Sequence, residues 1–88
     1  MRINKNFILR QVVDTYVVLP IGQASVDFNG MVTLNESGAF LWRQLEQGAT
    51  RETLADARTA EYDVSRAEAL ADIDAFLASL APVGCVEE

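Results

Sequence analysis

The chain has 88 residues, half of them hydrophobic, which favours one folded domain spanning residues 1–88 over a disordered chain. The single cysteine excludes an intramolecular disulfide, and the absence of histidine excludes histidine-based catalysis and an ordinary zinc site. No apolar run approaches the roughly 20 residues that a membrane span requires. The net charge of −6 falls entirely in residues 50–88, and such a surface repels nucleic-acid phosphates. We therefore expect a cytoplasmic protein without a metal, a cofactor or a membrane partner.

Strands are predicted in the first part of the chain, over about residues 7–34. Residues 7–13 and 16–20 are rich in β-branched and apolar side chains, and the Asp14-Thr15 pair between them predicts a two-residue turn. Alternating residues at 24–28 lead to Asn29-Gly30, the sequence typical of a type I′ hairpin turn, and residues 31–34 would be the returning strand. The expected sheet is antiparallel, with three to four strands.

At Asn35 the apolar period changes from two to 3.6, which predicts helices from there on. Asn35 is a suitable N-cap for a helix over about residues 36–47, and Gly48 would end it. Thr50 can cap a second helix over about residues 51–62, although the apolar face of that helix is thin.

A third helix is predicted over about residues 66–81. Ser65 and Glu68 form a capping-box pattern at its start, and Pro82 follows its end. Its apolar residues fill one arc of about 120° at 100° per residue, a face suited to packing on the sheet. Strands grouped before helices predict an α+β fold.

The order and spacing of four segments carry a resemblance to a known family. The segments are YVVLP, NGMVTLNESGAFLW, LEQGATRETLADARTAEYDVS and DIDAFLASLAPVGCVEE. Together they resemble the PqqD-like family, also called RiPP recognition elements, from about residue 7 to residue 86. The segment between Pro20 and Met31 is longer than in the shorter members, so a hairpin there would add a strand or cover a sheet edge.

The resemblance implies a winged-helix-like, non-catalytic domain that binds the leader segment of a ribosomally made precursor peptide. Such a domain presents the leader to a maturation enzyme, for example a radical SAM enzyme. In the family the leader joins the sheet as an added strand, beside the strand before the first helix and against the third helix. The peptide-binding residues expected here are Phe28, Met31, Val32, Thr33, Leu34, Ala69, Asp72, Ile73 and Phe76.

Several of these residues also have a purely structural interpretation. Leu34 and Ile73 are expected in the core, Phe76 fits the core and a groove equally well, and Asp72 fits a solvated helix face. Met31 and Phe76 are the best candidates for apolar pockets, Met31 because its thioether adapts to varied partners. If Glu68, Asp72 and Asp74 are unopposed by basic groups, a bound leader should be neutral or basic beside the third helix.

Two alternatives come from other functional classes. A winged-helix nucleic-acid-binding regulator would share the helical arrangement, but its recognition helix should be basic, whereas residues 51–61 carry two positive and three negative charges. A scaffold or dimerisation module would instead pair through the free strand edge. An enzyme is disfavoured, because carboxylates and one thiol alone assemble no recognisable catalytic site.

Overall fold

The computed structural model describes residues 1–22 and 32–87. A three-stranded antiparallel sheet has the order β2-β3-β4 and comprises β2 (Phe7–Val12), β3 (Thr15–Pro20) and β4 (Val32–Leu34). It is followed by the helices α2 (Glu36–Glu46), α3 (Arg51–Glu61) and α4 (Arg66–Leu80). This arrangement confirms the predicted α+β fold of an antiparallel sheet followed by three helices. The predicted strand at residues 24–28 and the Asn29-Gly30 turn lie outside the described residues.

The turn of the β2–β3 hairpin lies one residue earlier than predicted. Val12 pairs with Thr15, so the two turn residues are Val13 and Asp14 rather than Asp14 and Thr15. Val13 has a φ of 58°, a left-handed conformation that is unusual for a β-branched residue. The sequence prediction was wrong here because pairing along six residues of each strand sets the register and outweighs the local turn preference.

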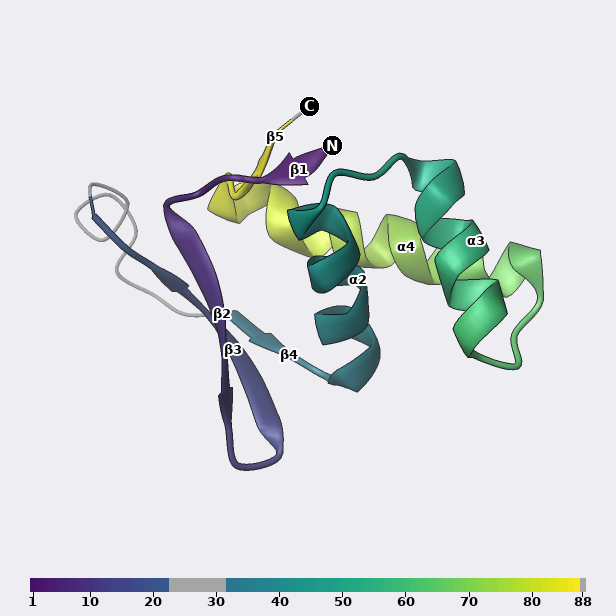
Figure 1. Cartoon of the computed structure of the whole chain (residues 1–88), viewed down its shortest axis with the longest axis horizontal. Coiled ribbons are helices and arrows are strands. Elements are labelled where there is room, and N and C mark those ends of the chain that lie inside the picture. Colours follow the sequence, from purple (N-terminus) through teal and green to yellow (C-terminus); the bar gives the residue numbers. More distant parts are fainter. Residues whose placement is uncertain (23–31, 88) are drawn as a thin grey trace.

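A second, two-stranded sheet joins the two ends of the described chain. β1 (Arg2–Ile3) pairs with β5 (Val86–Glu87), and the Asn4 N–H donates to the Cys85 carbonyl at 2.7 Å. A short 3-10 helix, η1 (Ala81–Val83), connects α4 to β5. Figure 1 shows β1 and β5 side by side, above the hairpin of β2 and β3. Two-residue strands are too short to show alternation, so the sequence analysis missed this sheet.

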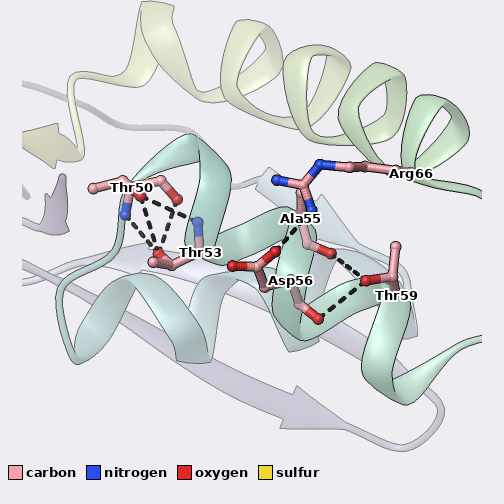
Figure 2. Close-up of polar contacts among 6 residues, drawn as sticks. All are labelled: Thr50, Thr53, Ala55, Asp56, Thr59 and Arg66. Carbon is pink, nitrogen blue, oxygen red and sulfur yellow. Dashed lines mark hydrogen bonds and ion pairs between the residues drawn. The ribbon is translucent and has the colours of Figure 1, made fainter.

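Side-chain caps fix the starts of all three helices at the predicted residues. Asn35 Oδ1 accepts a hydrogen bond from the Gly38 N–H at 2.8 Å. Ser65 and Glu68 form the predicted capping box at the start of α4. At α3 the box is made by Thr50 and Thr53, each accepting from the other's backbone N–H, as Figure 2 shows. These caps satisfy N–H groups that have no partner inside the helix.

The core lies where the sheet meets the three helices. Val18 of β3, Trp42 and Leu45 of α2, Leu54 of α3 and Ile73 of α4 are all fully buried. Burial of one large apolar side chain contributes about 1.5–3 kcal/mol, so this cluster fixes the position of α4 relative to the sheet. In the described part of the chain no helix is long and apolar enough to cross a membrane.

Candidate functional site

The outer edge of β4 is the first component of the site. In the described part of the chain β4 has a strand neighbour only on its β3 side, where Thr33 pairs with Val17. Successive N–H groups of a strand point to opposite sides, so β4 directs part of its hydrogen-bonding groups away from β3. A sheet edge of this kind is able to pair with another chain.

A groove of about 350 Å³ lies beside β4, and we call it the β4–α4 groove. Four elements line it. Residues 33–35 come from β4 and the turn after it, and Ser37, Gly38 and Leu41 come from α2. Arg58 comes from α3, and Asp72, Ala75, Phe76 and Ser79 come from α4. The groove therefore combines a strand edge that pairs with no further strand among the described residues with one face of the last helix.

The predicted peptide-binding residues divide into three groups. Thr33, Leu34, Asp72 and Phe76 line the groove. Val32, Ala69 and Ile73 do not: Val32 is half-buried against the core, and Ala69 and Ile73 are fully buried. Phe28 and Met31 lie outside the described residues.

Two apolar residues belong to both the core and the groove. Leu34 is 7% exposed and Phe76 is 8% exposed, yet both line the groove, so they form its apolar floor. Gly38 keeps this floor accessible. A Cβ atom at Gly38 would come within 3.3 Å of Leu34 Cβ and of Asn35 Oδ1, closer than ordinary side-chain contacts.

Arg58 is a groove residue that the sequence analysis did not predict. It is buried on α3, and its Nη2 donates to Asp72 Oδ2 at 2.8 Å. Its guanidinium carbon lies 4.9 Å from the ring centroid of Tyr62, which itself packs edge-on against Phe40 at 5.4 Å. The four-residue spacing between Arg58 and Tyr62, which directly follows α3, was the local signal in the sequence for the contact between these two side chains.

Two of the three α4 carboxylates, Asp72 and Asp74, are paired with arginines, whereas the Glu68 side chain accepts a hydrogen bond from the Ser65 backbone N–H. Arg58 of α3 pairs with Asp72, and Arg51 of α3 donates to Asp74 through two bonds of 2.8 Å. The hydrogen bond from Arg51 lowers the pKa of Asp74, and the same bond raises the pKa of Arg51. The expectation of an unopposed acidic helix was wrong for Asp72 and Asp74, because it counted charges along α4 and not those facing it from α3. A preference for basic leaders therefore loses its basis.

Figure 2 shows a further ion pair that joins the start of α4 to α3, in which Arg66 Nη1 lies 2.7 Å from Asp56 Oδ1. Every arginine in α3 and α4 is thus paired with a carboxylate. Among residues 1–22 and 32–87, no group of three or more Asp, Glu, Cys or His side chains is placed to hold a metal ion. The groove offers hydrogen-bonding edges and apolar surface, which are the features of a binding site.

The fold and the groove define a small α+β domain with a binding groove between a sheet edge and its last helix. The chain belongs to the PqqD family: the family profile described as Coenzyme PQQ synthesis protein D matches residues 15–86. No curated protein sequence matches the chain significantly.

Two solved structures resemble the whole chain. One is TbiB1 in complex with the TbiA(beta) leader peptide, with a TM-score of 0.78 and 29% sequence identity, covering 99% of this chain and 95% of the other. The second is a lasso peptide synthetase B1 complexed with the leader peptide, with a TM-score of 0.76 and 26% identity, covering 99% and 96%. Both are complexes in which a domain of this fold binds a leader peptide.

Proposed function

We propose that this protein binds the leader segment of a ribosomally synthesised precursor peptide in the cytoplasm and presents it to a maturation enzyme, without catalysing a reaction itself. The leader adds to the sheet as a strand along the outer edge of β4 and lies in the β4–α4 groove. Thr33, Leu34, Asp72 and Phe76 contact it, and Phe28 and Met31 remain proposed contacts.

The observation that carries this proposal is that β4, the strand at one edge of the described sheet, lines the groove together with α4. Family membership and the two leader-peptide complexes support it. The paired arginines of α3 and α4 leave little free positive charge there for nucleic acid, so the same site gives no support to a nucleic-acid-binding regulator.

Strand addition suits a protein that must hold a peptide and later release it. Main-chain hydrogen bonds contribute about 0.5–1.5 kcal/mol each and depend little on sequence, whereas the apolar floor selects alternate side chains. A disordered leader also loses conformational entropy on binding. We therefore expect moderate affinity and clear selectivity at alternate leader positions.

A pair of tryptophan variants on α4 tests the proposal. Ala75 and Ala78 are both exposed on α4, but only Ala75 lines the groove. The probe is the tightest binder selected from a displayed library of random peptides about 14 residues long, labelled for fluorescence anisotropy. Ala75→Trp should fill the groove and weaken binding at least about tenfold, while Ala78→Trp should bind as the parent does.

Thermal unfolding of both variants provides the stability control, because neither substitution enters the core. Equal affinity of the Ala75→Trp variant and the parent would place the peptide elsewhere and contradict the proposal. Failure of the library to yield any binder would also count against it.

A further inference from the structure

The Arg58–Asp72 ion pair belongs to the wall of a groove whose floor, formed by Leu34 and Phe76, is apolar. Arg58 is 8% exposed, and among the described residues only its Nη2, of the three guanidinium nitrogens, has a hydrogen-bond partner. Nε and Nη1 are buried without an acceptor in the described part of the chain. A buried guanidinium that uses so few of its five N–H donors is costly, so an additional acceptor would stabilise it.

Asp72 is the complementary half of the pair. Its side chain is 53% exposed, and only its Oδ2 is engaged by Arg58. Oδ1 accepts no hydrogen bond from the residues that the structure describes. Both residues line the groove, where Asp72 offers an exposed, unused acceptor beside guanidinium donors that are themselves buried.

We propose that Arg58 and Asp72 form a specificity subsite that takes a neutral amide group of the bound peptide. On binding, an adjustment of the Arg58 side chain brings a guanidinium N–H to the amide oxygen, and Asp72 Oδ1 accepts from the amide N–H. This assignment rests on the proposed function, because it concerns the peptide bound in the same groove. The amide is either the side chain of Asn or Gln or a main-chain peptide group, since both offer the same donor and acceptor.

Charge balance favours a neutral group over an ionised one. Asp72 already neutralises Arg58, so a peptide carboxylate would add an unpaired negative charge beside Asp72 in a chain of net charge −6. A peptide lysine or arginine would compete with Arg58 for Asp72 and leave the buried guanidinium without its carboxylate. A neutral amide satisfies both partners and leaves their ion pair in place.

Arg51 provides a matched control for this site. Arg51 and Asp74 form a second ion pair between α3 and α4, also at 2.8 Å, but neither residue lines the groove. Removing each arginine therefore breaks an α3–α4 ion pair, and only Arg58→Met changes the groove wall.

The experiment uses the library-selected peptide against the parent protein, Arg58→Met and Arg51→Met. Arg58→Met should weaken binding about tenfold, and Arg51→Met should leave it unchanged. In one arm each Asn or Gln of the peptide is replaced by Leu, and in the other arm single main-chain amides are replaced by esters. In the parent protein one of these replacements should also weaken binding about tenfold, and it should have no further effect in Arg58→Met. The arm in which this occurs identifies the source of the amide.

Equal binding by the parent and Arg58→Met would overturn the subsite. Selection of an acidic residue at the peptide position whose replacement loses its effect in Arg58→Met would also overturn it. If Arg58→Met does not fold, Asp72→Ala takes its place, because Asp72 is half-exposed and removing it should still abolish the effect of the peptide replacement. Loss of binding in Ala75→Trp combined with equal binding in Arg58→Met would overturn the subsite alone and leave the proposed function intact.

Discussion

The register of the β2–β3 hairpin places Val13 in an unfavourable backbone conformation. Val13 is a β-branched residue with a φ of 58°, and the residue is 84% exposed. The left-handed region costs about 1–2 kcal/mol for a residue with a Cβ, and no burial of Val13 offsets it. The strain is local to the hairpin tip, which Figure 1 shows extending away from the helices.

Val13→Asn should therefore stabilise the protein, because Asn tolerates the left-handed conformation. We expect a gain of about 1 kcal/mol, or an increase in Tm of roughly 4–8 °C for a domain of this size. Thermal unfolding followed by circular dichroism measures it. Val12→Asn is the control, because Val12 lies in extended β2 and the same change there should not stabilise. A lower Tm for Val13→Asn than for the parent would refute the strain argument.

At the residue scale, the sequence separated core from groove only in part. Ile73 was correctly expected in the core, and Asp72 and Phe76 reach the groove, because helical periodicity assigns residues to faces. Arg58 could not be found in this way. Its role depends on Asp72, fourteen residues further along the chain, and that pairing follows from the packing of α3 on α4.

At the element scale, local chemistry was sufficient for the helices and insufficient for the short strands. The caps at Asn35, Thr50 and Ser65 act within three or four residues, so they can be predicted from the local sequence. The β1–β5 pairing and the position of the hairpin turn depend on contacts between distant segments or along a whole ladder. Neither has a local signature.

The edge of β4 can be tested with two neighbouring proline variants that control for one another. The N–H groups of Val32 and Thr33 point to opposite sides of the strand, so one faces β3 and the other faces the outer edge. Proline removes the N–H. One of Val32→Pro and Thr33→Pro should lower Tm by weakening the pairing with β3. The other should retain most of its stability and lose at least about tenfold in peptide affinity.

Thermal unfolding identifies which variant is which, and fluorescence anisotropy with the library-selected peptide measures affinity. The idea that the peptide adds to β4 would be untenable if the variant with the higher Tm bound the peptide as tightly as the parent does.

At the scale of the whole molecule, the fold places a strand edge, an apolar floor and a polar pair around one groove. The strand edge comes from the sheet order, the floor from Leu34 and Phe76, and the polar pair from the contact of α3 with α4. The fold class and the general place of the groove were predictable from the sequence and its family resemblance. The ion pairs between α3 and α4 were not predictable, because the spacing of residues along the chain does not show which sides of two helices contact one another.

Amide hydrogen exchange of the protein with and without the library-selected peptide tests the central claim, strand addition at β4, most directly. An added strand should slow exchange of the outward-facing N–H groups of β4, because they gain hydrogen-bond partners, and should slow exchange at alternate amides of the peptide. The edge of β2 serves as the internal control and should be unchanged. Protection at β2, or tight binding without any added protection in β4, would contradict the claim.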